Sequence, residues 1–295
     1  MKKNIALVLS SGGARGCAHI GAIKILKENG FNITSIAGTS MGALVGGIYA
    51  TGQLQQFEEW ISSLDIMEVL KLTDFSISRK GLVKGKKVIE RIKEIVPERN
   101  IEDLSVPFCA VATDILNGTE TVFAKGNLYE AIRASISIPT VFQPQKIEEH
   151  YYVDGGLLNP IPVNRVKRHA GDLLVVVNVS SPICYETKKI ENEPIPVKSQ
   201  LMYIDLIRDK FNSLIPTKND HDEDISIFNL TNRSISTMMQ KISELTLEKN
   251  KPDLLINISR DSFSTYDFYK AKEIIKEGEL ATLRALESFH KKSRK

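Results

Sequence analysis

The feature that most constrains the fold of this chain is a pentapeptide at positions 38–42, Gly38-Thr39-Ser40-Met41-Gly42. The stretch from Phe31 to Ala37 before it suits a short strand, and the small apolar stretch from Ala43 to Ala50 after it suits a buried helix. A serine between a strand and a helix, with glycine two positions away on each side, is typical of a nucleophile elbow. The pattern therefore predicts an α/β fold in which the Ser40 hydroxyl stands clear of the sheet.

Two physical features of such a turn matter for chemistry. Side chains two positions either side of the serine would collide with it or with the crossing strand, which explains the glycines. The first N–H groups of the following helix lack intrahelical partners and point at developing negative charge. A Gly-x-Ser-x-Gly match also arises by chance in a chain with 18 glycines. The strand before Ser40 and the helix after it favour the functional interpretation.

The rest of the chain supports a parallel sheet. Ile5 to Leu9 is a continuous apolar run, as in a strand buried on both faces, and Ala18 to Asn29 has helical spacing. Two consecutive strand–loop–helix units predict a mainly parallel central sheet covered by helices. Further strands are expected at 107–113, 119–124, 151–153, 173–179 and 253–258, and further helices at 54–64, 86–96, 128–137, 200–211, 234–247 and 266–290.

Composition and charge exclude several classes of function. The net charge of +3 is too small to indicate a nucleic-acid partner, and none is expected. The cysteines Cys17, Cys109 and Cys184 contain no Cys-x-x-Cys pair, so neither a metal site nor a disulfide framework is expected. The apolar run near the N-terminus is too short for a signal peptide, and no stretch reaches the ~18 apolar residues of a membrane span. We expect a cytoplasmic, soluble protein, with peripheral contact at the inner face of the membrane left open.

A serine nucleophile needs a general base, and histidine is the usual one. No histidine occupies a convincing motif late in the chain. His19 lies inside the first predicted helix, where a packed or capping role is expected. The others lie in polar surroundings and are expected at the surface: His150, His169, His221 and His290.

Asp154 is the stronger candidate for the base. It directly follows a short predicted strand, and Gly155 and Gly156 after it allow the backbone to turn tightly toward another loop. A plain turn aspartate has the same local pattern, because Asp-Gly is a common hairpin signal. The absence of a suitable histidine favours the carboxylate. An aspartate with an ordinary pKa near 3.9 is a weak base, so catalysis would favour a raised pKa.

A glycine-rich loop follows the first strand and resembles an anion site. Gly12, Gly13 and Gly16 let the backbone pass close to a bound group at a helix N-terminus. Nucleotide binding is the competing interpretation. Ser11 stands where a dinucleotide motif has its first glycine, however, and the second strand ends without the acidic residue that would hold a ribose. Arg15 opposes the helix dipole, which suggests a role with an oxyanion, a lipid phosphate or a carboxylate; a solvated arginine is the alternative.

These motifs, in this order, resemble those of the patatin-like phospholipases, particularly the bacterial branch related to neuropathy target esterase. The matching segments are Gly12-Gly13-Ala14-Arg15-Gly16, Gly38-Thr39-Ser40-Met41-Gly42, Asp154-Gly155-Gly156, Ala134-Ser135-Ile136-Ser137-Ile138-Pro139 and Leu157-Leu158-Asn159-Pro160-Ile161-Pro162. The resemblance covers about residues 5–180 well. Ser11 departs from it, since many members have a third glycine there, but serine is nearly as small.

The resemblance implies a fold and a reaction. The fold would be a single three-layer α/β domain over residues 1–295, with its motif-bearing core at about 5–180 and a C-terminal strand and helices at 200–290 packing on it. The reaction would be hydrolysis of a phospholipid, lysophospholipid or related lipid ester by a Ser40–Asp154 dyad through an acyl-enzyme. Backbone N–H groups of the loop from Gly12 to Gly16, including those of Ala14 and Arg15, would stabilise the oxyanion. No metal or cofactor is implied.

Two alternative functions stay open, and so does the way in which a lipid would reach the site. The same serine could serve a lipid acyltransferase, or the fold could belong to a non-catalytic lipid-binding protein. Basic residues in the stretch 74–87 could meet anionic headgroups, although a solvated loop fits as well. The stretch 185–230 is polar and could form a lid. The residues at 290–295 suit a frayed basic tail, and the sequence does not indicate the oligomeric state.

Overall fold

The computed structural model describes residues 3–72, 86–139, 141–183 and 227–293. The chain divides into two compact units, Met1–Cys184 with Met238–Lys295, and Tyr185–Thr237. The expected helix at 200–211 and most of the stretches 74–87 and 185–230 lie outside the described residues. The expectation of one domain over the whole chain stays a prediction.

The strands of the described residues form one eight-stranded, mainly parallel sheet. Its order is β5-β6-β3-β2-β1-β7-β8, and β4 pairs with β3. The pairs β1–β2, β2–β3, β1–β7 and β7–β8 are parallel, whereas β4, β5 and β6 run antiparallel to their neighbours. The strands are β1 Lys3–Leu9, β2 Phe31–Thr39, β3 Phe108–Asp114, β4 Thr119–Phe123, β5 Gln145–Ile147, β6 His150–Asp154, β7 Leu173–Ser181 and β8 Leu254–Ser259.

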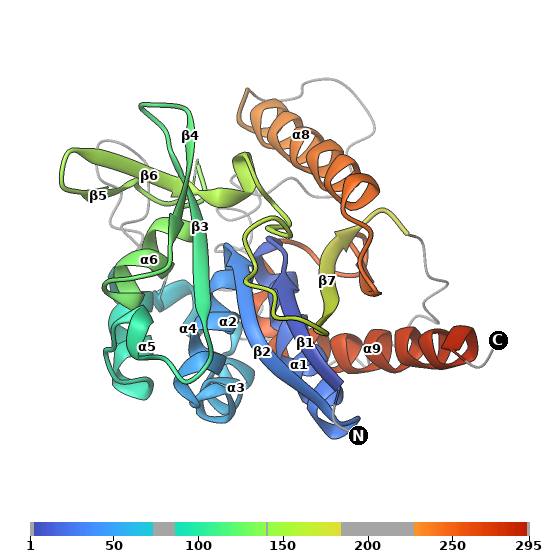
Figure 1. The fold of residues 1–295 in the computed structure, drawn as a ribbon. Helices are drawn as coiled ribbons and strands as arrows, with labels where there is room; N and C mark the ends of the chain where they lie inside the picture. The colour runs from blue at the N-terminus through green and yellow to red at the C-terminus, as the bar shows by residue number, and fades with distance from the viewer. Residues whose placement is uncertain (1–2, 73–85, 140, 184–226, 294–295) are drawn as a thin grey trace, which may run out of the picture. The chain divides into compact units, whose positions relative to one another are not determined.

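Helices of 7 to 11 residues connect these strands, and two helices of 23 residues lie near the C-terminus of the sequence (Figure 1). The α-helices are α1 Ala18–Glu28, α2 Met41–Thr51, α3 Leu54–Ser63, α4 Ile66–Leu72, α5 Lys86–Ile95, α6 Leu128–Ser135, α8 Ile227–Lys249 and α9 Ala271–Ser293. Short 3-10 helices are η1 Gly13–Cys17, η2 Ile101–Asp103, η3 Gly155–Leu157 and η4 Phe268–Lys270.

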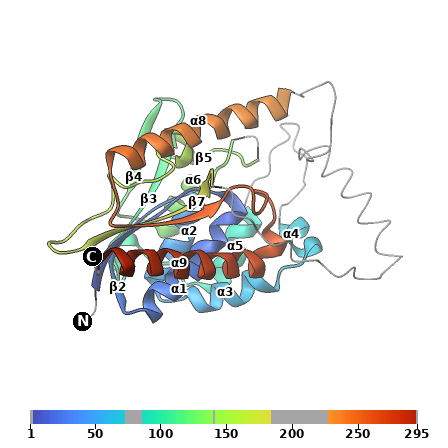
Figure 2. The same cartoon turned by 90° about the vertical axis from the view of Figure 1, so that its right-hand side faces the viewer.

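The central strands are buried on both faces, and alternate side chains enter different layers. Ile5, Leu7 and Leu9 of β1 belong to the main core cluster, together with side chains of α1, α2 and α9. Val8 points the other way, into a smaller cluster with Ile161 and the C-terminal part of α8. Figure 2 shows α1, α3 and α9 on one side of the sheet. The mainly parallel sheet flanked by helices confirms the predicted fold class.

The structure also contains elements that the sequence did not predict. The strand β5 has only three residues, and α4 has seven with mixed exposure, so neither leaves a clear periodic signal. The expected frayed tail is wrong in part, because α9 continues to Ser293. The predicted helix at 266–290 begins later, at Ala271, after the 3-10 turn η4.

Candidate active site

The site is built at the carboxyl ends of β1 and β2, where ligands commonly bind in parallel sheets. Leu9 and Gly38 are register partners, so the loop after β1 and the turn after β2 leave the sheet side by side. Ser40 follows β2 with φ 57° and ψ −125°, a conformation that L-residues rarely adopt. The serine is therefore held in a strained turn between β2 and α2.

The glycines on either side of Ser40 are required by close backbone contacts. A Cβ added to Gly38 would lie 2.4 Å from the Gly42 carbonyl oxygen, and one added to Gly42 would lie 2.2 Å from the Leu9 carbonyl oxygen. Both positions are thus too crowded for any side chain. The turn brings the start of α2 directly against the end of β1.

The Ser40 hydroxyl donates a hydrogen bond to Asp154, with Oγ 2.5 Å from Oδ2. Asp154 is the last residue of β6, and its register partner on β3 is Ala112. Its second carboxylate oxygen accepts the Gly156 N–H at 2.8 Å. Ser40 is 1% exposed and Asp154 is 4% exposed, so the pair is shielded from water. The structure brings together the two side chains that the sequence singled out.

Burial raises the pKa of the Asp154 carboxyl to about 6, although the hydrogen bonds from Ser40 and Gly156 act in the opposite direction. These two donors are a hydroxyl and one backbone amide, and they do not fully compensate for the loss of water. A carboxylate with a pKa near neutrality is a better proton acceptor than an ordinary aspartate. The chemical consequence is a basic oxygen within hydrogen-bond reach of a strained serine.

The glycines after Asp154 allow its loop to approach β3. A Cβ on Gly155 would lie 2.2 Å from the Val111 carbonyl oxygen. A Cβ on Gly156 would lie 2.5 Å from the Met239 methyl group of α8 and 3.0 Å from Asp154 Oδ1. A side chain at Gly155 would collide with the backbone of β3, and one at Gly156 would crowd both Met239 and the Asp154 carboxylate.

The glycine-rich loop after β1 carries two main-chain donors that are free of partners among the described residues, the N–H groups of Gly12 and Gly13. Gly13 has φ +57°, which favours glycine. A Cβ on Gly16 would lie 2.3 Å from Met41 Cγ, so this loop lies against the start of α2. The Ala14 N–H, expected among the oxyanion donors, instead donates to the Thr265 carbonyl at 2.8 Å.

Arg15 is partly buried, and its hydrogen bonds within the described residues go to uncharged acceptors. Its guanidinium donates to the carbonyls of Arg260 and Phe263 at 3.3 and 3.2 Å, and to Ser180 Oγ at 3.3 Å. Burial lowers the pKa of Arg15 to about 10, which leaves it charged at neutral pH. The side chain joins the glycine-rich loop to the segment after β8.

Ser135, the last residue of α6, and Ser137, two residues further on, also position the pair, although the sequence alone assigned them no role. The Ser40 N–H donates to Ser135 Oγ at 2.8 Å, and this hydroxyl donates in turn to the Val111 carbonyl at 2.6 Å. The Asp154 N–H donates to the Ser137 carbonyl at 3.0 Å. The Ser-x-Ser pattern before Pro139 was the available signal, but it does not say which atoms these serines contact.

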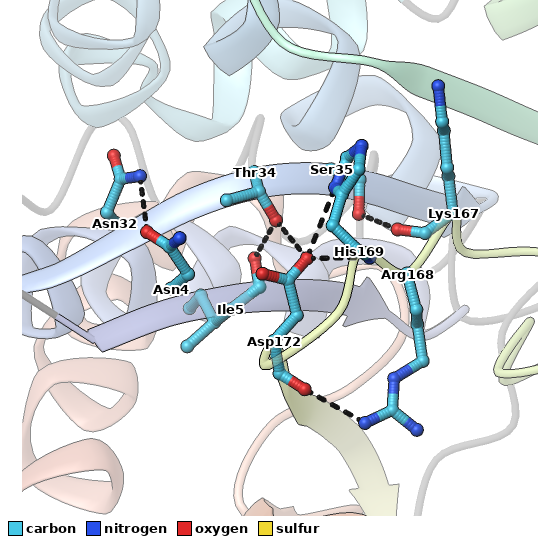
Figure 3. A network of polar contacts seen from close by, with 9 residues as sticks. All are labelled: Asn4, Ile5, Asn32, Thr34, Ser35, Lys167, Arg168, His169 and Asp172. Atoms are coloured by element: carbon cyan, nitrogen blue, oxygen red, sulfur yellow. Dashed lines mark hydrogen bonds and ion pairs between the residues drawn. The ribbon is translucent and has the colours of Figure 1, made fainter.

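The described histidines have partners away from this pair. His19 is buried and its Nε2 lies 2.9 Å from the Ser10 carbonyl oxygen; burial lowers its pKa to about 4. His150 is half-exposed and contacts Asp114 at 2.6 Å. His169 is half-exposed and contacts Asp172 at 3.3 Å (Figure 3). His290 lies on α9, and His221 falls outside the described residues.

In the part of the chain that the structure describes, no three histidine, cysteine, aspartate or glutamate side chains are grouped as a metal site would require. None of the described helices combines the length and apolar character needed to cross a membrane. The predicted cytoplasmic location stays a prediction.

The sheet and the strained turn at Ser40 define an α/β protein whose site lies at the carboxyl edge of a mainly parallel sheet. The model of the patatin-like phospholipase family matches residues 7–166. An uncharacterised NTE family protein of Mycobacterium tuberculosis is 32% identical over 97% of this chain and 92% of its own length. The chain belongs to the patatin-like phospholipase family, and this membership supports a lipid hydrolase function.

Two other comparisons are more distant. Human patatin-like phospholipase domain-containing protein 6 is 31% identical over 60% of this chain, which corresponds to 13% of that much longer protein. The crystal structure of VipD from Legionella pneumophila superposes with a TM-score of 0.44 at 14% identity, covering 98% of this chain and 67% of VipD.

Proposed function

We propose that this protein is a serine acyl hydrolase that cleaves the ester bond of a phospholipid, lysophospholipid or related lipid through Ser40 and Asp154. The observation that carries the proposal is the 2.5 Å hydrogen bond between the hydroxyl of a strained serine and a buried carboxylate. Family membership supports the choice of a lipid ester as the substrate.

The first half of the reaction transfers the acyl group to Ser40. As the Ser40 oxygen attacks the ester carbonyl carbon, its proton passes to Asp154 Oδ2. The tetrahedral intermediate then collapses, the carbon–oxygen bond to the alcohol breaks, and Asp154 returns the proton to the leaving alcohol. The raised pKa of Asp154 suits it to accept this proton and to release it again.

The second half releases the fatty acid. A water molecule takes the place of the alcohol and gives a proton to Asp154 as its oxygen attacks the acyl-enzyme. Collapse of the second intermediate breaks the bond to Ser40, and the proton on Asp154 returns to the serine oxygen. The carboxylate thus serves as base and acid in turn, with no net change in its protonation.

Main-chain donors stabilise the negative charge of both intermediates in this proposal. The free N–H groups of Gly12 and Gly13 supply this stabilisation, because the Ala14 N–H is already bonded to Thr265. A single oxyanion donor contributes on the order of 10²–10³ in kcat in serine hydrolases. The strained, pre-formed turn avoids reorganisation during the reaction.

The test is hydrolysis of a short p-nitrophenyl acyl ester by wild type, Ser40→Ala and Asp154→Asn, followed by phospholipid vesicles. We expect turnover by wild type alone and labelling of Ser40 by a fluorophosphonate. A matched control is Ser63→Ala, a serine on the exposed surface of α3, which should act as wild type does. Turnover by both site variants at the wild-type rate would contradict the proposal. Acylated lipid product without matching free fatty acid would indicate acyl transfer instead.

A further inference from the structure

The segment after β8, residues 260–265, lies far from the glycine-rich loop in sequence and outside the part that the family model matches. It nevertheless holds that loop by three hydrogen bonds, made by two consecutive residues of the loop. Arg15 donates to the carbonyls of Arg260 and Phe263, and the Ala14 N–H donates to the carbonyl of Thr265. A further hydrogen bond, outside this segment, joins Arg15 to Ser180 Oγ near the end of β7.

The segment is itself fixed to the sheet. The Arg260 N–H donates to the Ser181 carbonyl at 2.9 Å, and Phe263 packs against the main core cluster. Arg260 also donates to Gln240 on α8, next to Met239, whose methyl group approaches Gly156. One continuous set of contacts therefore connects the glycine-rich loop with the loop that carries Asp154.

The charge of Arg15 suits this position. Its guanidinium is largely withdrawn from water, and its Nε is buried without a partner in the described structure. Asp261 and Asp267, on the same segment and just beyond it, favour the charged form of Arg15. A buried cation that contacts mainly backbone carbonyls fixes the distance between two loops, since carbonyls cannot move independently of the chain.

We infer that Arg15 is a positioning residue, and that through it residues 260–265 set the direction of the Gly12 and Gly13 N–H groups. The inference rests on the proposed function, because those N–H groups are its oxyanion donors. Gly13 immediately precedes Ala14, and a Cβ on Gly13 would lie 2.6 Å from the Thr265 carbonyl oxygen. The two free donors thus sit directly beside the two residues that the segment holds. Preorganisation of such donors is what makes them effective in the transition state.

The test compares Arg15→Gln, Arg15→Lys and a control, Arg91→Gln, on the p-nitrophenyl ester. Arg91 is half-exposed on α5 and pairs with Glu94. We expect Arg15→Gln to lower kcat roughly 10- to 100-fold, less than the loss of a whole donor, with KM changed less than about twofold. Arg15→Lys, which keeps the cation, should recover part of this loss. The control should keep the wild-type kcat.

A second measurement does not depend on activity. Hydrogen exchange of a peptide covering residues 11–17 should become faster in Arg15→Gln and stay unchanged in Arg91→Gln. Ser180→Ala, a milder change at the same contact, should lower kcat by a few-fold if Arg15→Gln does not fold. Wild-type kcat and exchange in a folded Arg15→Gln variant would overturn the inference, and so would wild-type kcat in Ser180→Ala where Arg15→Gln does not fold. A wild type that neither turns over nor labels at Ser40 would instead contradict the proposed function.

Discussion

Two buried aspartates at opposite ends of the sheet have opposite pKa shifts. Asp154 lies at the carboxyl edge and is 4% exposed; Asp172 precedes β7 at the amino edge and is 5% exposed. Burial raises the pKa of Asp154 to about 6. Burial also acts to raise the pKa of Asp172, but its hydrogen bonds outweigh burial and lower the pKa below its ordinary value.

Two factors differ: the depth of burial, which is greater for Asp154, and the number of hydrogen-bond donors. One oxygen of Asp172, Oδ2, accepts hydrogen bonds from the Thr34 hydroxyl at 2.6 Å and from the His169 backbone N–H at 3.0 Å. The same oxygen lies 3.3 Å from His169 Nδ1 (Figure 3). Thr34 reaches it because the register between β1 and β2 slips there: Ile5 pairs with Ile33 and Ala6 with Ser35. The two oxygens of Asp154 have one donor each. Asp154 lies deeper in the protein and has fewer donors, so its carboxyl has a raised pKa, whereas the donors to Asp172 hold the pKa of that carboxyl low.

The largest effect that tests this comparison is on turnover. Asp154→Asn should lower kcat on the p-nitrophenyl ester by on the order of 10³-fold or more, because the amide cannot accept the Ser40 proton. Asp172→Asn, its matched control, should keep kcat within about threefold. A similar loss in both variants would mean that Asp154 acts through folding and not through proton transfer.

The next effect is on the pH profile. In the proposed reaction Asp154 accepts a proton only when deprotonated, so kcat/KM of the wild type should fall as pH decreases through about 6 and level off above it. The measurement is kcat/KM between pH 4.5 and 8.5, with Asp172→Asn expected to show the same midpoint. A flat profile across this range would contradict the assignment of Asp154 as the titrating base.

The two variants should also change stability in opposite directions. A raised pKa means that folded protein binds the Asp154 proton more tightly than unfolded protein, so this group's contribution to stability falls as pH rises from about 4 to 6 and stays unfavourable above. Asp154→Asn should therefore increase the free energy of unfolding at pH 8, by on the order of 2 kcal/mol, and have less effect at pH 4. Urea unfolding of both variants at the two pH values measures this.

The contribution of Asp172 to stability depends on pH in the opposite direction. Its lowered pKa stabilises the fold above the ordinary aspartate pKa, and that contribution is lost as pH falls through the folded value. Asp172→Asn should lower the free energy of unfolding at pH 8 by about 1 kcal/mol, the scale of a weakened hydrogen bond to a charged group. An increase in stability would show that the unpartnered Oδ1 of Asp172 dominates the energetics of this carboxylate.

The smallest effect concerns His169. Its side chain is 47% exposed and lies 3.3 Å from Asp172, so His169→Ala should cost about 0.5 kcal/mol or less. The backbone N–H of the residue would still donate to Asp172. Urea unfolding at pH 6 and pH 8 measures this change in the free energy of unfolding. A decrease above about 2 kcal/mol would mean that the imidazole and not the main chain holds the Asp172 carboxylate.

The sequence predicted most of the sheet and the residues of the candidate site. Long apolar runs such as Leu173 to Val179 and spaced glycines have local causes, burial on two faces and steric exclusion, so they can be read from the chain alone. Short elements such as β5 could not be found, because three residues carry no period. The partners of Arg15 and of Ser135 could not be found either, because their acceptors are backbone carbonyls, which every residue has.

By itself, the sequence determined the strand–Ser40–helix turn and the presence of an aspartate at the start of a glycine turn, because both depend on neighbouring residues. Only the tertiary structure decided that Ser40 and Asp154, 114 positions apart, share a hydrogen bond. It also decided that this carboxylate is the weaker acid of the two compared, since a pKa depends on burial and on donors from distant elements.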